Sequence, residues 1–155
     1  MIVAVGAAQI LFPTGNARLT TLLAFAAFIA LAIQRRSWFP VVACVAWLSG
    51  YEAALNITLI ALGRPQTLDP LHFSVYLALA ILGPLGLARR GYPPSWPLLA
   101  AAAIVWIVWL ATGFHVNGHS LVDFSVPAEV WNELSKMLWA AAYFVPFVRE
   151  VRRRN

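Results

Sequence analysis

Two carboxylates and the single lysine of this chain lie within strongly apolar segments, where charged side chains are rare. Glu52 stands near the middle of one segment, and Glu133 and Lys136 stand three residues apart in another. A charge removed from water needs a partner, a proton or a water-filled cavity, and its affinity for protons shifts accordingly. Such shifts suit general acid–base chemistry, so Glu52, Glu133 and Lys136 are the candidate catalytic residues.

Glu52 and Lys136 are expected at similar depths in a membrane. Counted along a helix at about 1.5 Å per residue, Glu52 lies about 16 Å and Lys136 about 13 Å from the outer ends of their segments. Similar depth predicts that the two side chains pair between helices. The pair could serve catalysis, or it could be a structural ion pair that holds the two helices together.

Side chains that could hold a substrate recur around these charges. Residues three and four apart share one face of a helix, and the polar side chains near Glu52 and Glu133 have this spacing. Large aromatic side chains nearby could line a cavity for a hydrophobic ligand, or they could pack in the core or face lipid. The candidate substrate-binding residues are Asn56, Asn132, Glu129, Trp139, Trp109 and Tyr143.

His115 and His119 are four residues apart, and Asp123 follows after four more. On a helix this spacing would place all three on one face, and together with His72 they could hold a zinc ion. The Asn-Gly pair between the two histidines favours a turn instead, in which case they are solvated loop residues. No metal and no other cofactor is therefore expected, and zinc is kept as an alternative.

The composition indicates a polytopic membrane protein. Hydrophobic residues make up 61% of the 155 positions, charged residues make up 11%, and mean hydropathy is +0.75. A helix of about 20 mostly apolar residues crosses a bilayer and bonds its own backbone. We predict an all-α single domain over residues 1–155, a bundle of five transmembrane helices plus a short apolar N-terminal segment. The helices are expected at about 17–34, 39–63, 70–88, 95–113 and 127–148.

Arginine positions predict the orientation in the membrane, because cytoplasmic loops carry an excess of Lys and Arg. Arginine pairs stand at 35–36 and 89–90, and further arginines lie within 149–154. Five crossings put these groups on one side. The C-terminus is therefore expected in the cytoplasm and the N-terminus outside, in the plasma or inner membrane. Arginines at helix ends also make a nucleic-acid surface unexpected.

Two short fragments resemble a known family. Segments 47–51 (WLSGY) and 83–85 (GPL) are similar to the emopamil-binding sterol isomerases, which also have five helices. The resemblance places that family's acid–base His and Glu at Asn56 and Ile60, and the Asn of its last helix at Lys136. The residue types differ, so the chemistry does not carry over. A second resemblance, to zinc amidases of the alkaline ceramidase type, rests on Glu52 with Asn56, on His72 and on the pair His115 and His119. Those enzymes have seven helices, and their last histidine pair lies within a helix.

These observations predict a small integral-membrane enzyme that performs acid–base chemistry on a lipid or isoprenoid in the outer half of the bilayer. Its expected partners are membrane lipid and a hydrophobic small-molecule substrate, with homo-oligomerisation as an open alternative. A second hypothesis is a dimeric proton-coupled transporter or channel component. A third is a non-catalytic subunit of a larger membrane complex. The enzyme is favoured because a conduction path would also carry polar residues through the inner half of the membrane.

Overall fold

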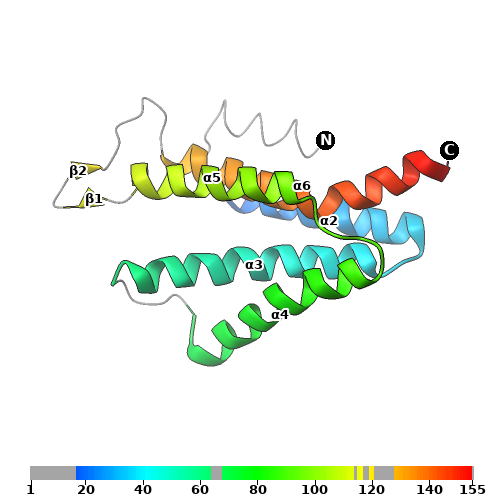
Figure 1. The fold of residues 1–155 in the computed structure, drawn as a ribbon, viewed down its shortest axis with the longest axis horizontal. Helices are drawn as coiled ribbons and strands as arrows, with labels where there is room; N and C mark the ends of the chain where they lie inside the picture. Colours follow the sequence, from blue (N-terminus) through cyan, green and yellow to red (C-terminus); the bar gives the residue numbers. More distant parts are fainter. Residues whose placement is uncertain (1–16, 64–67, 114, 117–118, 121–127, 155) are drawn as a thin grey trace. The chain divides into compact units, whose positions relative to one another are not determined.

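The computed structural model describes residues 17–63, 68–113, 115–116, 119–120 and 128–154 (Figure 1). These residues confirm the predicted helical architecture. The helices are α2 (Ala17–Arg35), α3 (Phe39–Ala61), α4 (Pro70–Arg89), α5 (Trp96–Gly113) and α6 (Ala128–Arg154). Two strands of two residues each, β1 (His115–Val116) and β2 (His119–Ser120), pair antiparallel between α5 and α6. The apolar N-terminal segment that the sequence predicts lies outside the described residues.

The helices begin and end close to the predicted residues, with one clear exception. α6 continues to Arg154, whereas the sequence predicted its end at 148. Arginine and glutamate are favourable helix residues. An ion pair with 2.6 Å between Arg35 Nη1 and Glu150 Oε2 also holds this part of α6 to the end of α2. α3 ends slightly early, because Gly63 turns the chain with a φ of 67°.

Contacts within the chain divide it into two compact units. Unit 1 comprises the residues up to Ala27 together with Ser95–Ala142. Unit 2 comprises Phe28–Pro94 and Tyr143–Asn155. Helices α2 and α6 each contribute to both units, and the single domain over residues 1–155 stays a prediction.

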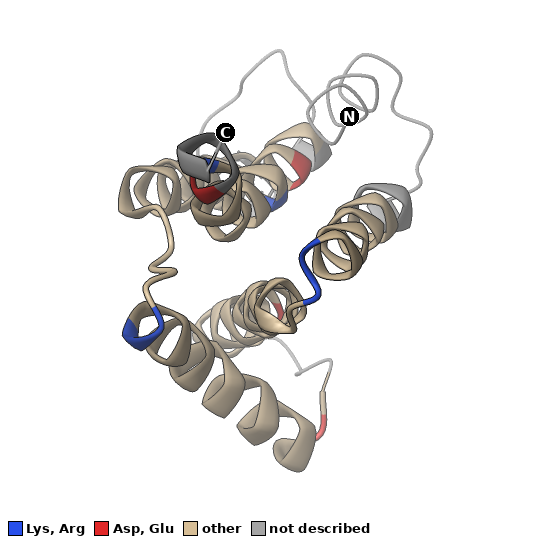
Figure 2. Cartoon of the chain, turned by 90° about the vertical axis from the view of Figure 1, so that its right-hand side faces the viewer, with Lys and Arg blue, Asp and Glu red and all other residues tan. Residues whose placement is uncertain are grey.

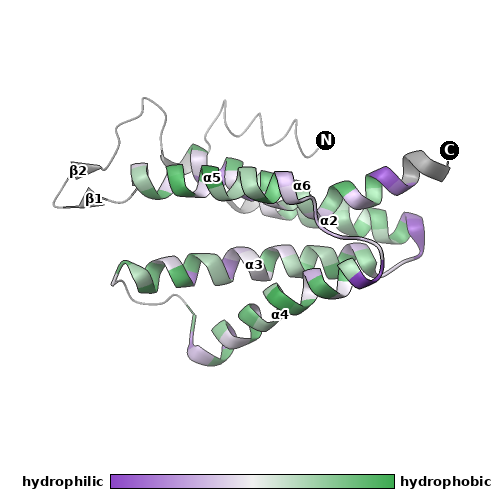
Figure 3. Cartoon of the chain, viewed as in Figure 1, coloured by the Kyte–Doolittle hydropathy of each residue, from purple (hydrophilic) through white to green (hydrophobic). Residues whose placement is uncertain are grey.

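Two of the described helices, α3 and α4, are long and apolar enough to cross a membrane. Shorter apolar helices occur at Thr21–Arg35 and Trp96–Thr112. Charged residues are sparse along the helices (Figure 2), and apolar residues dominate α3, α4 and α5 (Figure 3). Leu87 is the one buried residue within α4, whose other apolar side chains are largely exposed. A helix surface of this kind suits contact with lipid.

In unit 2, α3 and α4 pack closely because Gly83 has no side chain. A Cβ built at Gly83 would lie 2.5 Å from the Cβ of Ala46 and 3.3 Å from its Cα. Pro84 follows inside α4 and cannot donate the helical hydrogen bond to the carbonyl of Ala80. The small residues Gly83 and Ala46 therefore let the backbones of α4 and α3 approach closely, as is common between membrane helices.

In unit 1, two hydrogen bonds fix α5 and α6 as an antiparallel pair. Ser135 Oγ donates to the carbonyl of Ala102 over 3.0 Å. Two helical turns away, the backbone N–H of Ser95 donates to the carbonyl of Ala142 over 2.8 Å. That carbonyl has no helical N–H partner, because the residue four positions on is Pro146, which lacks an N–H. The proline inside α6 thus frees the acceptor that holds the start of α5.

Candidate acid–base site

Lys136 and Glu133 form an ion pair on α6. Lys136 Nζ donates to Glu133 Oε1 over 2.8 Å, and the two side chains are only 10% and 14% exposed. The other carboxylate oxygen, Glu133 Oε2, is buried and has no hydrogen-bond partner among the described residues. The Glu133 carboxylate is therefore held through one oxygen, Oε1, while Oε2 is buried.

Ser135, which lies between the two charged residues in the sequence, fixes how α6 is rotated. It is fully buried, and its hydrogen bond to the Ala102 carbonyl directs this side of α6 toward α5. Adjacent residues on a helix point about 100° apart, so fixing Ser135 also fixes the directions of Glu133 and Lys136. Ser135 was not among the predicted site residues. A small polar residue between two charges in an apolar segment was the signal that could have identified it.

Three tryptophans gather on α5 and α6 near the ion pair. The ring of Trp106 lies 4.8 Å from that of Trp109 and 6.2 Å from that of Trp139, in edge-to-face geometry at 68° and 83°. Trp139 follows Lys136 by three residues, so the cluster borders the ion pair along α6. The structure thus brings the predicted Trp109 and Trp139 together through Trp106. Trp106 stands three residues before Trp109, a spacing that places both on one helical face.

Asn56, a predicted substrate-binding residue, bonds the backbone of unit 2. Its side chain is fully buried. Asn56 Nδ2 donates to the backbone carbonyl of Glu52 over 2.8 Å, and Asn56 Oδ1 accepts from the N–H of Leu68 over 3.4 Å. The amide therefore ties the end of α3 to the segment that leads into α4. We assign Asn56 a structural role on this basis.

The predicted pairing of Glu52 with Lys136 joins two different units. Glu52 belongs to unit 2 and is partly buried, whereas Lys136 belongs to unit 1 and contacts Glu133 on its own helix. The pairing stays a prediction. Asn132 is partly buried beside Glu133 in sequence, and Tyr143 is buried at the point where α6 enters unit 2. Glu129 lies in the first turn of α6, with its side chain outside the description.

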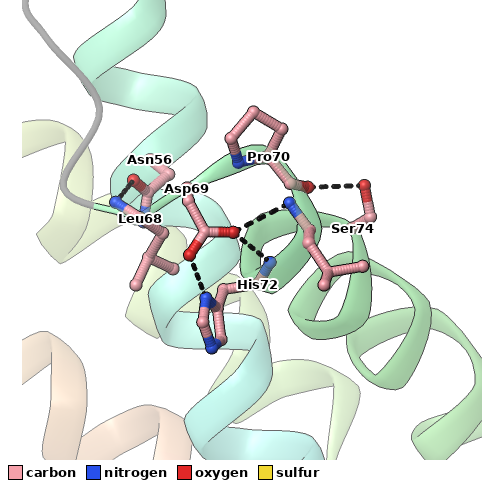
Figure 4. A network of polar contacts seen from close by, with 7 residues as sticks. Asn56, Leu68, Asp69, Pro70, His72 and Ser74 are labelled. Carbon is pink, nitrogen blue, oxygen red and sulfur yellow. Dashed lines mark hydrogen bonds and ion pairs between the residues drawn. The ribbon is translucent and has the colours of Figure 1, made fainter.

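His72 and Asp69 form a capping arrangement at the start of α4 (Figure 4). Asp69 Oδ1 accepts from the backbone N–H groups of Leu71 and His72, each over 3.0 Å. Asp69 Oδ2 contacts Nδ1 of the His72 ring. The N–H of His72, and then its side chain, hold the pKa of the Asp69 carboxyl below its usual value. The sequence predicted His72 as a candidate metal ligand, and the structure shows it completing a helix cap.

The candidate zinc residues do not gather among the described side chains. No three His, Cys, Asp or Glu side chains come together in the part of the chain that the structure describes. The backbone of His115 lies opposite Ser120, and that of Val116 lies opposite His119, so the histidines stand on a short hairpin and not on one helix. Asp123 and the imidazole rings of both histidines lie outside the description, so zinc binding there stays an alternative prediction.

No protein-family model, curated protein or solved structure matches this chain. The fragments that resemble sterol isomerases have packing roles in unit 2. Gly83 lies against Ala46, and Trp47 is buried with its ring 6.3 Å from that of Phe28. Any functional assignment therefore rests on the side chains and their geometry.

Proposed function

We propose that the protein is a small integral-membrane enzyme in which Glu133 and Lys136 perform acid–base chemistry on a lipid or isoprenoid. The observation that carries this proposal is the shielded Glu133–Lys136 ion pair beside the Trp106–Trp139 cluster. Binding sites for small molecules combine a mostly apolar lining with a few polar groups that orient the ligand. A ligand with a polar head and an apolar chain matches that combination.

Each member of the ion pair has its own task. Glu133 Oε2 accepts a proton from the head of the substrate and returns it at a second position. The ammonium group of Lys136 stabilises the carboxylate before transfer and the negative charge that develops on the substrate afterwards. Both side chains are largely shielded from water, so these electrostatic interactions are stronger than at a surface. The tryptophan rings contact the apolar chain of the substrate.

The membrane setting of this proposal is a bundle of five crossing helices. The lengths and apolarity of α3 and α4 support two of these crossings, and the shorter apolar helices Thr21–Arg35 and Trp96–Thr112 are compatible with two more. The arginine groups at 35–36, 89–90 and 149–154 favour a cytoplasmic C-terminus, an external N-terminus and a plasma or inner membrane. Arg18 and Arg64 are the two arginines that this arrangement leaves outside. Glu133, near the start of α6, then lies in the outer half of the bilayer.

Native mass spectrometry of the purified protein in mild detergent tests the proposal. Wild type is expected to carry a lipid or isoprenoid that Glu133→Gln loses and Glu52→Gln retains. Glu52→Gln is the comparison variant, because it neutralises the candidate catalytic carboxylate of α3 and so distinguishes a site on α3 from one on α6. Loss of the ligand in Glu52→Gln alone would move the site to α3, and equal retention in all proteins would overturn the proposal.

A second variant guards against misfolding. Glu133→Gln leaves Lys136 without its carboxylate, which destabilises a buried site. The double variant Glu133→Gln/Lys136→Met removes both charges and keeps similar side-chain volumes. It is expected to fold, as judged by circular dichroism and gel filtration, and still to lose the ligand. A folded double variant that retains the ligand contradicts the assignment.

A dimeric transporter component is a second candidate, favoured by the exposure of α4. Side chains such as Leu82 and Ile81 are 64% and 54% exposed. This apolar surface could contact a second copy instead of lipid. Oxidative crosslinking of Leu82→Cys in native membranes tests whether α4 contacts a second copy. The native Cys44 is buried, so a crosslink is expected only through the introduced cysteine. A monomer contradicts the dimeric transporter component. A crosslinked dimer shows that α4 contacts a second copy, as that component requires, and is also compatible with an oligomeric enzyme.

A further inference from the structure

Helices α2 and α4 end in the same turn, and each turn presents two arginines. A residue with positive φ follows each helix end, Arg36 at 48° and Gly91 at 85°. The next backbone N–H then bonds a carbonyl five residues back, over 3.1 Å after α2 and 2.9 Å after α4. This is a Schellman motif, and it holds the pairs at 35–36 and 89–90 where the helix dipole favours cations.

Aromatic and ionic contacts within unit 2 join these two turns to α6. The ring of Tyr92 lies 4.8 Å from that of Phe147 and 5.4 Å from that of Phe39. Arg35 Nη2 donates to the Phe147 carbonyl, and Arg35 Nη1 donates to the Glu150 carboxylate, each over 2.6 Å. Three segments that are far apart in sequence therefore meet at one end of unit 2. We name this end, with its arginines, the arginine end.

The arginine end carries an excess of exposed positive charge. Glu150 is the one acidic residue that the sequence places near these turns, and Arg35 neutralises it. Among the side chains that the structure describes, the arginines exposed at this end are Arg36, Arg89, Arg90 and Arg149. In Figure 2 the α2–α3 turn and the end of α4 are blue on the side that faces the viewer. Anions are attracted to such a surface.

We infer that the arginine end binds the phosphate groups of anionic phospholipids in the inner leaflet. Guanidinium groups bind phosphate through paired hydrogen bonds. Exposed apolar surface adjoins the arginines at the end of α4, because Leu85, which is 56% exposed, precedes Arg89 by one helical turn. Trp38, 80% exposed, stands two residues after Arg36, as expected of a residue at the membrane interface. Exposed arginines beside exposed apolar side chains suit a lipid better than a free anion.

This inference rests on membrane insertion of α3 and α4 and does not depend on Glu133. The test offers the detergent-solubilised protein equal amounts of phosphatidylglycerol and phosphatidylcholine with the same acyl chains, and counts retained lipids by native mass spectrometry. Wild type is expected to retain phosphatidylglycerol preferentially. Arg36→Gln/Arg89→Gln/Arg90→Gln is expected to lose this preference, by roughly fivefold for each arginine removed.

Three comparisons keep the test decisive. The matched control Arg64→Gln removes a positive charge that the predicted orientation places outside, and it is expected to keep the preference. The triple lysine variant at positions 36, 89 and 90 preserves charge and is expected to keep most of it. Raising the salt concentration for wild type is expected to abolish the preference without any substitution, since salt screens exposed charges. Equal retention of both lipids by wild type, or an unchanged preference in the triple glutamine variant, overturns the inference.

Discussion

The hydroxyl of Ser135 on α6 donates a 3.0 Å hydrogen bond to the backbone carbonyl of Ala102 on α5, and both residues are buried. The bond crosses between the helices at the level of the ion pair, because Ser135 stands between Glu133 and Lys136. Packing of the helix pair and orientation of the candidate site are therefore coupled through one hydroxyl group. A substitution at Ser135 is expected to affect both.

Ser135→Ala is expected to lower the free energy of unfolding by about 1 kcal/mol, the usual contribution of a buried interhelical hydrogen bond. Unfolding in mild detergent measures the change. Ser74→Ala is the matched control, because Ser74 is exposed and its hydroxyl bonds the Pro70 carbonyl within its own helix. Equal effects of the two substitutions would show that the interhelical bond contributes nothing.

Gly83→Ala and Gly86→Ala are expected to change stability in opposite directions. A Cβ at Gly83 would lie 2.5 Å from that of Ala46, so α3 and α4 must separate, at a loss of about 1–3 kcal/mol. A Cβ at Gly86 meets no atom within 4 Å, and alanine favours helix by up to about 1 kcal/mol. Thermal unfolding of both variants gives the comparison. A Gly83→Ala protein as stable as wild type contradicts the close approach.

Glu150→Gln is expected to destabilise unit 2, because Arg35 would lose its carboxylate partner. The two side chains are 16% and 23% exposed, so we expect about 1–2 kcal/mol, less than for a fully buried pair. Arg149→Gln removes an exposed neighbouring charge and should change stability by less than about 0.5 kcal/mol. Chemical unfolding at two salt concentrations tests this. A loss in Glu150→Gln that disappears at high salt would indicate a merely superficial pair.

Asp69 is expected to make the start of α4 sensitive to acid. Its pKa is lower in the folded protein than in the unfolded chain, chiefly because the His72 N–H bonds the carboxylate. Its contribution to stability is therefore present above the unfolded pKa of about 3.9 and is lost as the pH falls through the folded value. Asp69→Asn keeps a capping side chain but cannot titrate in this range. As the pH is lowered from above the unfolded pKa of about 3.9 through the folded pKa of Asp69, the melting temperature should fall more in wild type than in Asp69→Asn.

The helix bounds could be predicted because apolar runs and their Arg, Gly and Pro ends are local signals. The extension of α6 could not be predicted in this way. Its arginines indicate topology as well as a helix end, and the contact that holds this segment, Arg35 with Glu150, joins residues 115 positions apart. Five membrane crossings also exceed what the described helices establish, since only α3 and α4 meet the length and apolarity needed.

Spacing places Glu133 and Lys136 within one turn of a helix, which permits the ion pair that the structure shows. The pairing of Glu52 with Lys136 rests on depth alone and stays a prediction. Depth cannot distinguish partners, because many residues share one level of a membrane. The role of Asn56 was hidden for a similar reason. Its acceptor oxygen binds Leu68, and only the path of the chain after α3 brings that N–H near.

Pro146 gives the helix pair of unit 1 a preferred direction of opening. Separation of the two helices at Ser95 would strand the Ala142 carbonyl, which has no helical donor, and an unbonded backbone group in lipid costs several kcal/mol. Transient separation therefore begins at the opposite end, where α5 finishes at Gly113 and α6 starts at Ala128. Amide hydrogens near Gly113 are therefore expected to exchange with solvent first and the Ser95 amide last.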